Sequence, residues 1–475
     1  MDNFTLYDII LLVVFVIFIS VFLYTHRKNL KKEGLLFLYK TGVGIKIINR
    51  IGNKYKKTLN VLGYVSIVLG FLLMIGMLYL FGKLVWIYVF QNQLVQLIKI
   101  PPIVPLLPYL PQIFKLNFLP PFYFIYWILI IAIVAIFHEF AHGIFAANKG
   151  VKIKSTGFGF FPFFLPVFLA AFVELNEKQM GKKKISSQMA VLSAGTFANL
   201  LTAILFFGIL LLFFSLSFAP SGVVFDTYTY SAVGISAITS VNSLSVNNVT
   251  YNQLLSLTNV SGLSEIKVNN TKYFVTESFL SQQANSQYLL LYDDAPAIKA
   301  NLSNTIISID NVNVKDTKEL AVELAKYKPG DKITVTALSG GNNQDYKITL
   351  GINPQNSNLP YLGVGFLNRK SSGVFGNIIS AFSSFKDPNT YYKANFGAAE
   401  FIYDLLWWLV LICFSVALVN MLPVGIFDGG RFFYLAMLAI TKSKEKSRKI
   451  FGAVTYLFLF LLLVIMIFWA IGTFR

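Results

Sequence analysis

The segment Ala135-Ile-Phe-His-Glu-Phe-Ala-His-Gly143 decides the fold, because it places polar side chains at the end of a long apolar run that begins near Pro121. Two of the three histidines in the chain, His138 and His142, stand four residues apart. On a helix this spacing puts both imidazoles on one face, so that both reach a single Zn²⁺. Glu139 lies between them and would stand beside a water bound to that ion. The spacing therefore predicts a zinc site with a carboxylate suited to moving a proton.

The same three residues could instead be packed or exposed helix side chains that bind nothing. The sequence around them argues against this interpretation, because it is long and apolar enough to cross a bilayer. Ionisable side chains are costly to bury in a membrane span and usually mark a functional site there. We therefore favour the metal site.

The composition indicates a polytopic α-helical membrane protein, since 55% of the 475 residues are hydrophobic and 13% are charged. Lysine and arginine outnumber the acids 40 to 22, but the excess is clustered beside apolar runs. It therefore predicts membrane topology, with the bilayer as partner, and no nucleic-acid partner. The single cysteine, Cys413, excludes a disulfide within the chain and any metal site that needs two cysteines. A metal must be held by histidine and carboxylate ligands.

Apolar runs predict about six transmembrane helices. They cover Leu6–Tyr24, Leu59–Phe90, Phe122–Ala147, Gln188–Phe218, Phe401–Leu422 and Phe451–Phe474. The segment from His26 to Lys57 holds ten Lys or Arg and one acid, so we expect it to be cytoplasmic, with the N-terminus outside. The basic run Lys442–Lys449 is likewise expected to be cytoplasmic. No small-residue cleavage site follows the first spans, so we expect retained helices and no signal peptide.

Three apolar stretches do not suit a continuous helix. Residues 91–120 contain six prolines and are expected to be interfacial on the outer side. The stretch from Gly157 to Phe172 contains two glycines and two prolines, which favours a membrane-embedded hairpin or strand pair. Residues 371–395 are amphipathic and are expected to lie at the interface.

Between about Pro220 and Pro360 the sequence changes to alternating β-branched and polar residues, which predicts a soluble α+β insert on the outer side. It contains a weak internal repeat, because Ile238–Val246 matches Ile306–Val314 after a shift of 68 residues. Each copy reads as strand, turn, short strand and helix.

A catalytic zinc site needs a third protein ligand and one open position. Asp428 is the leading candidate, since it follows an inward span and so lies at the expected depth of the histidines. Glu174 and Glu177 compete, but they lie among cytoplasmic lysines, and Asp404 would lie near the outer end of its span. Alternatively, Asp428 caps a helix over residues 431–440.

These motifs together resemble the site-2 protease family of intramembrane zinc metalloproteases. The resemblance rests on the HEFAH motif, the N-x-x-P-x-x-x-x-D-G segment from Asn420 to Gly429 and the insert, which resembles tandem PDZ domains. It implies that the chain cleaves transmembrane segments of membrane-protein substrates. It also implies that Zn²⁺ is held by His138, His142 and Asp428, with Glu139 as the catalytic base and acid.

The resemblance implies further roles for three residues. Asn199, in a Gly195-x-x-x-Asn pattern, would stabilise the oxyanion, while Asn420 and Pro423 would shape the substrate site. The hairpin at 157–172 would receive the substrate as an added strand. Asn199 could instead make an interhelical hydrogen bond, and Asn420 could cap the end of its helix.

We expect six parts along the chain. They are an N-terminal transmembrane pair with an interfacial segment (1–120), the first part of the catalytic core (121–218), two PDZ-like domains (219–290 and 291–360), an interfacial linker (361–397) and the second part of the core with the last helix (398–475). The active site would lie toward the cytoplasmic side of the cell membrane.

Two other functions are compatible with the sequence. One is a membrane zinc peptidase that acts on soluble or membrane-edge peptides with a glutamate as third ligand. The other is a transporter or PDZ scaffold without enzymatic activity, in which the metal is structural. For the PDZ-like folds themselves, the alternative to peptide capture is that they bind no peptide and merely gate access.

Overall fold

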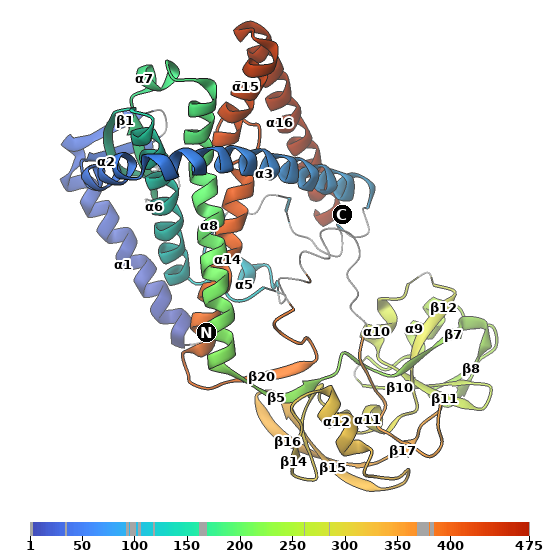
Figure 1. Ribbon diagram of the computed structural model, residues 1–475. Helices are drawn as coiled ribbons and strands as arrows, with labels where there is room; N and C mark the ends of the chain where they lie inside the picture. The colour runs from blue at the N-terminus through green and yellow to red at the C-terminus, as the bar shows by residue number, and fades with distance from the viewer. Residues whose placement is uncertain are drawn as a thin grey trace. The chain divides into compact units, whose positions relative to one another are not determined.

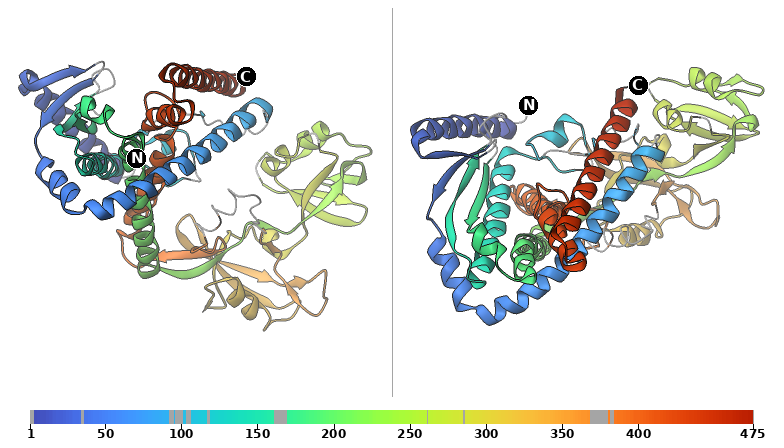
Figure 2. Two further views of the ribbon diagram at one scale, coloured as in Figure 1. Left: turned by 45° about the horizontal axis from the view of Figure 1, so that its top comes forward. Right: turned by 90° about the horizontal axis from the view of Figure 1, so that it is seen from above.

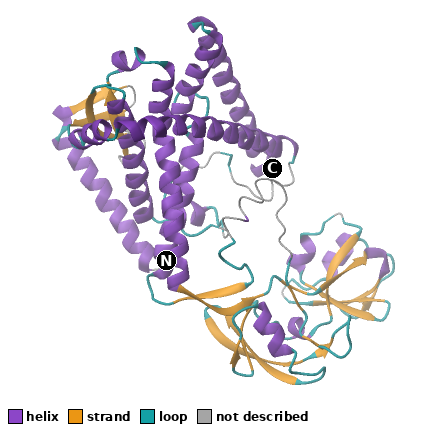
Figure 3. Ribbon diagram, in the orientation of Figure 1, coloured by secondary structure: helices purple, strands orange, loops and turns teal. Residues whose placement is uncertain are grey.

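The computed structural model describes residues 3–33, 36–91, 95, 101–102, 106–116, 119–160, 169–260, 262–284, 286–367, 380 and 384–474. The chain divides into two compact units. One comprises Met1–Phe213 with Glu400–Arg475, and the other comprises Phe214–Ala399. The first unit is mainly helical and the second is built mainly from strands (Figure 3).

Six helices among the described residues are long and apolar enough to cross a membrane. They are α1 (Asn3–Thr25), α3 (Lys56–Phe90), α6 (Phe124–Asn148), α8 (Ile185–Ser217), α14 (Ala399–Val419) and α16 (Lys444–Phe474), labelled in Figure 1. This number confirms the prediction of a polytopic membrane protein. One boundary differs, since the helix of the last predicted span, Phe451–Phe474, begins earlier, at Lys444. The pair between Lys449 and Glu445, 2.8 Å apart and one turn from each other, favours that helical start.

The first half of α6 is largely buried. Its aromatic residues pack against α14, where Trp408 and Cys413 are buried with them. Where buried indoles need acceptors, backbone carbonyls supply them: Trp127 Nε1 donates to the carbonyl of Leu106 at 2.8 Å, and Trp408 Nε1 donates to that of Pro121 at 3.1 Å. The helix that carries the two histidines is therefore held in place by packing and by these hydrogen bonds.

Helix α3 runs across α8 rather than along it (Figure 1). Two glycines make the crossing close, since a Cβ at Gly63 would lie 3.4 Å from Ala190 and one at Gly70 would lie 3.2 Å from Ser193. The Ser193 hydroxyl donates to Ser66 on α3 at 3.0 Å. Small residues and a buried hydroxyl pair thus join the two helices, as is common in membranes.

A buried carboxylate on α1 holds the beginning of α6. Asp8 accepts the backbone N–H groups of Phe124 at 2.7 Å and Ile125 at 3.0 Å, and also the hydroxyl of Tyr109 at 2.5 Å. These two N–H groups are among the first of α6, which have no acceptor inside the helix. A negative charge there also interacts favourably with the helix dipole. Asp8 therefore fixes α1 to the helix that carries the histidines.

Four antiparallel strands form a sheet in the order β1-β2-β3-β4. They are β1 (Leu30–Glu33), β2 (Leu36–Thr41), β3 (Ile153–Phe160) and β4 (Leu169–Leu175). Figure 2 shows the sheet beside α6. The predicted strand pair is thus present as β3 and β4, while 161–168 at its tip lie outside the described residues. Strands β1 and β2 correct the expectation of a simple loop over residues 26–57.

Four shorter α-helices lie in the described part of the first unit. They are α2 (Ile45–Lys54), α5 (Leu110–Ile113), α7 (Glu177–Gly181) and α15 (Asp428–Thr441). Helix α2 packs closely on the end of α6, because a Cβ at Gly52 would meet Ala147 at 2.7 Å. Helix α5 lies within the proline-rich segment 91–120, of which 92–94, 96–100, 103–105 and 117–118 lie outside the described residues.

The second unit contains two six-stranded sheets. One has the order β7-β12-β11-β10-β8-β9 and is made of β7 (Tyr230–Gly234), β8 (Ile238–Val241), β9 (Leu244–Ser245), β10 (Ser264–Val268), β11 (Thr271–Val275) and β12 (Tyr288–Asp293). The other has the order β16-β15-β13-β5-β20, with β14 beside β13, and is made of β5 (Phe218–Val224), β13 (Thr305–Ile309), β14 (Val312–Asn313), β15 (Lys332–Ser339), β16 (Asn342–Thr349) and β20 (Thr390–Ala394).

The described residues of this unit also form two strand pairs and four short α-helices. The pairs are β17 (Gly351–Ile352) with β18 (Pro360–Tyr361), and β19 (Val364–Gly365) with β6 (Thr227–Tyr228). The helices are α9 (Tyr251–Leu257), α10 (Glu277–Ser281), α11 (Pro296–Lys299) and α12 (Thr317–Leu324). Strand β20 comes from the expected linker 361–397, of which 368–379 and 381–383 lie outside the described residues.

The repeat seen in the sequence has the same local structure in both copies. Each sheet has a two-residue hairpin turn with positive φ at both central positions, at Asn242 and Ser243 in one copy and at Asp310 and Asn311 in the other. Asn and Asp tolerate this conformation, and it suits the twist of a two-residue hairpin. A helix follows each hairpin, α9 in the first copy and α12 in the second.

Replacing Asp8 with alanine should destabilise the protein. The two N–H groups at the start of α6 would lose their acceptor. Each buried group left unpaired lowers the free energy of unfolding by about 1–3 kcal/mol. The thermal unfolding midpoint of the full chain in detergent should fall. Ser20→Ala is the matched control, because the exposed Ser20 hydroxyl bonds only within α1, to Val16. Equal midpoints for the two variants would contradict the proposed link between α1 and α6.

Candidate metal centre

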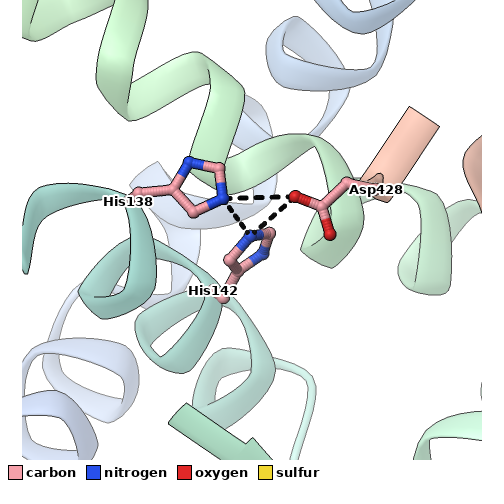
Figure 4. A group of neighbouring side chains, drawn as sticks. All are labelled: His138, His142 and Asp428. Carbon is pink, nitrogen blue, oxygen red and sulfur yellow. Dashed lines mark hydrogen bonds and ion pairs between the residues drawn. The ribbon is translucent and has the colours of Figure 1, made fainter. Parts of the chain in front are cut away.

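Helix α6 brings the two predicted histidine ligands together. His138 and His142 are both buried, at 8% exposure, and their Nε2 atoms lie 3.0 Å apart. They come from consecutive turns of the same face, as the spacing of four predicted. Figure 4 shows both rings turned toward Asp428.

Asp428 meets this pair from a helix nearly three hundred residues later in the chain. Its Oδ2 lies 3.2 Å from Nε2 of His138 and 3.2 Å from Nε2 of His142. Asp428 is the first residue of α15, and Phe427 is the N-cap, with no side-chain capping bond. The carboxylate therefore faces the imidazoles, and the alternative interpretation of Asp428 as a helix cap was wrong.

The loop before Asp428 is closed by backbone contacts. The N–H of Gly429 donates to the carbonyl of Asn420 at 2.7 Å, across the turn that follows α14. A Cβ at Gly429 would meet the backbone of Met421, and one at Gly430 would meet the carbonyl of Val424. Only glycine permits so close an approach. The two glycines after Asp428 thus set the position of the carboxylate.

The three side chains fit a divalent ion such as Zn²⁺. Their ligand atoms lie within 4.8 Å of one another, and their separations of 3.0, 3.2 and 3.2 Å form a nearly regular triangle. Tetrahedral zinc with bonds of about 2.0–2.1 Å separates its ligands by about 3.3–3.4 Å. Two imidazoles and one carboxylate also match the ligand set of a catalytic site that keeps a fourth position open. This group is the candidate metal centre.

Other polar groups contact the far side of each imidazole. His142 Nδ1 lies 2.7 Å from the carbonyl of Val191 on α8, which fixes the proton on Nδ1 and leaves Nε2 to bind a metal. His138 Nδ1 lies 3.0 Å from the side-chain nitrogen of Asn199, also on α8. Helix α8 therefore orients both rings.

Glu139 lies beside the centre and contacts the edge of the sheet. Its Oε2 accepts the backbone N–H of Val173 on β4 at 2.9 Å. Strand β4 therefore fixes the carboxylate of the residue that follows His138. Neither this N–H nor the Val191 carbonyl could be found from the sequence, since backbone groups carry no signal in residue type.

Gly195 also lies at the site, although in the sequence it stands out only as the first residue of the Gly195-x-x-x-Asn pattern. A Cβ built on it would meet Nε2 of His142, and would lie 2.6 Å from Nε2 of His138. Helix α8 must therefore present bare backbone to the histidine pair. The space for the ion depends on this glycine.

The glutamates that competed with Asp428 are held elsewhere. Glu174 accepts from Lys40 at 2.8 Å and from Ser155 at 2.6 Å, and these contacts lower the pKa of its carboxyl to about 2. Glu177 pairs with Arg431 at 2.7 Å. Among the described residues, the only group of His, Cys, Asp and Glu side chains placed to hold a metal is the one that contains Asp428. Asp404 is not part of it.

Asn420 and Pro423 lie in the loop before Asp428. Asn420 directly follows α14, where a helix cap was the alternative interpretation, and its carbonyl closes the loop. Pro423 is buried, and its carbonyl lies 3.4 Å from the hydroxyl of Thr455 on α16. In this structure the carbonyls of both residues accept hydrogen bonds that hold the loop. Their role in shaping the substrate site stays a prediction.

Comparisons with known proteins point to one family. The sequence model of peptidase family M50 matches residues 126–465. An uncharacterized protein of Methanocaldococcus jannaschii is 31% identical over 202 residues, which are 41% of this chain and 48% of that protein. The zinc metalloprotease RasP of Shouchella clausii is 24% identical over 211 residues, 38% of this chain and 50% of RasP. The chain thus spans about half the length of the curated relatives it matches.

Gly195→Ala should remove most of the metal bound by the purified protein, because the added methyl group would occupy the space beside the two Nε2 atoms. Gly208→Ala is the matched control, since Gly208 lies on the same helix and a Cβ there meets nothing within 4 Å. Metal content per chain, measured by elemental analysis, checks the expectation. Equal metal content in the two variants would show that the centre does not lie against Gly195.

Proposed function

Because the chain belongs to peptidase family M50, we propose that it is an intramembrane zinc metalloprotease that cleaves transmembrane segments of other membrane proteins. The observation that carries the proposal is the group of His138, His142 and Asp428 on helices of the apolar unit. Family M50 is a family of zinc metalloproteases. RasP, the relative from Shouchella clausii, carries the name zinc metalloprotease.

In this proposal the two histidines and Asp428 hold Zn²⁺. Bound zinc would lower the pKa of a water toward about 7 and polarise the scissile carbonyl. Glu139 lies next to His138 and would accept the proton of the attacking water, then return it to the leaving amine. The hydrogen bond from Val173 orients this carboxylate without protonating it, so it stays a proton acceptor.

The edge of β4 is the proposed place for the substrate. Among the described strands β4 has one neighbour, β3, and its other edge carries the N–H of Val173 toward Glu139. N–H groups alternate along a strand, so that of Ala171 lies on the same edge. A peptide bond inside a helix is shielded, so the substrate must be extended before cleavage. Addition as a strand to β4 would extend it beside Glu139.

The proposal extends to the membrane topology that the sequence predicts. We place β3 and β4 in the membrane, with the N-terminus and the 214–399 unit outside and the metal centre toward the cytoplasmic face. The basic segment 26–57 supports this orientation. The two repeated hairpin–helix elements support the proposal that the insert contains two PDZ-like domains, over 219–290 and 291–360, which gate access to the core.

Cleavage of a single-span model substrate in detergent or vesicles, measured together with bound zinc, tests the function. Zinc-dependent cleavage within the span is expected. Cleavage of soluble or membrane-edge peptides only would favour the alternative peptidase, and bound zinc without any cleavage would favour a transporter or scaffold with a structural metal.

Glu139→Gln should abolish cleavage while zinc stays bound, because the amide cannot accept the proton and does not ligate the metal. Loss of a general base lowers rates by about 10²–10⁴-fold. Glu445→Gln is the control, since Glu445 is an exposed carboxylate on α16 that pairs with Lys449. Measuring rate and zinc content on the same samples separates chemistry from metal loss. Cleavage retained in Glu139→Gln would remove this residue from the mechanism.

Ala171→Pro should slow cleavage by about tenfold, the equivalent of one hydrogen bond of about 1.4 kcal/mol, because proline removes the outward N–H. Ala171→Val adds similar bulk but keeps the N–H, so it should cleave nearly normally. Both variants should bind zinc as the parent chain does. Equal rates for the two variants would argue against strand addition at β4.

A further inference from the structure

The buried amide of Asn199 has one polar atom without a partner. Asn199 is fully buried on α8, and its Nδ2 lies 3.0 Å from Nδ1 of His138. Its Oδ1 is buried and has no hydrogen-bond partner. Buried polar atoms of proteins are rarely left unpaired, so this oxygen needs an explanation.

The tautomer of His138 conflicts with the amide orientation. The side-chain nitrogen of asparagine only donates hydrogen bonds. With Nδ2 of Asn199 facing His138, Nδ1 of His138 must therefore be an acceptor. The proton of a neutral ring would then sit on Nε2, the atom that faces Asp428 at 3.2 Å and His142 at 3.0 Å. A protonated Nε2 cannot bind a metal. His142 has no such conflict, because its Nδ1 contacts the carbonyl of Val191, which only accepts.

Exchanging the two atoms of the amide removes the conflict. The oxygen and nitrogen of an asparagine side chain have nearly the same shape, so the exchange needs no movement of the backbone. Oδ1 would then accept a hydrogen bond from Nδ1–H of His138 over the same 3.0 Å. Oδ1 gains a partner and Nδ2 moves to the position without one, so the gain lies in the tautomer of His138: the lone pair of its Nε2 is directed at the metal position. Both histidines would then donate from Nδ1 to an oxygen on α8.

We propose that Asn199 is a positioning residue that accepts the Nδ1–H of His138 and so holds Nε2 ready to bind zinc. The inference rests on the proposed function, in which His138 is a zinc ligand. The bond joins α8 to α6, as the alternative of an interhelical hydrogen bond expected, and the proposal adds to it a role beside the metal. The amide nitrogen would take the position that Oδ1 now holds, so a donor role toward substrate stays compatible with it.

Zinc affinity of the full chain in detergent, measured by competition with a chelator, tests this role without reference to activity. Asn199→Ala should weaken zinc binding by about 10–100-fold, as expected for loss of a ligand-orienting hydrogen bond. Asn199→Asp should restore the parent affinity, because a carboxylate also accepts from Nδ1–H. Thr202→Val is the control, since the buried Thr202 hydroxyl lies one turn away on α8 and bonds only to Ala198.

Each other outcome contradicts the inference. Unchanged affinity in Asn199→Ala would show that the amide does not orient His138, and loss of affinity in Asn199→Asp would show that the amide donates rather than accepts. Either result leaves the proposed protease intact, provided that the parent chain binds zinc and cleaves its substrate. A parent chain that binds no zinc would overturn both proposals. Equal thermal midpoints in Asn199→Ala and Thr202→Val would exclude unfolding as the cause.

Discussion

The structure depends on one arrangement, in which a carboxylate and two imidazoles converge among apolar helices. Charged groups in such surroundings are unfavourable unless they are paired or bind a metal. The ligand atoms of His138, His142 and Asp428 converge to 3.0–3.2 Å, the arrangement that suits one bound cation. Much of the surrounding backbone serves this convergence: Gly195 leaves space beside the imidazoles, and the contact of Gly429 with Asn420 closes the loop that carries Asp428.

The four-stranded sheet connects this centre to the rest of the first unit. Lys40 on β2 and Ser155 on β3 both bond to Glu174 on β4, so side chains as well as the backbone ladder join the strands. Next to Glu174, Val173 donates to Glu139. The proposed base is thus attached to a strand edge whose position depends on the N-terminal hairpin β1-β2. Through this dependence, strands β1 and β2 help to position the site.

Features that depend on local spacing could be predicted from the sequence. The histidine pair needs only the helical period, the apolar runs need only their length, and Asp428 followed from the depth at which two spans end. Strands β1 and β2 could not be predicted in the same way, because β2 pairs with β3 more than a hundred residues away. The orientation of Asn199 and the donor from Val173 also depend on contacts between distant segments, and residue type alone does not determine them.

The central claim is that one zinc ion is bound by side chains from α6 and α15. Anomalous scattering at the zinc absorption edge, measured on crystals of the full chain, would locate the ion directly. The account predicts a single peak within bonding distance of His138, His142 and Asp428. A peak bound by the histidines and a different carboxylate, or no peak beside the histidines in a zinc-loaded and active protein, would contradict it.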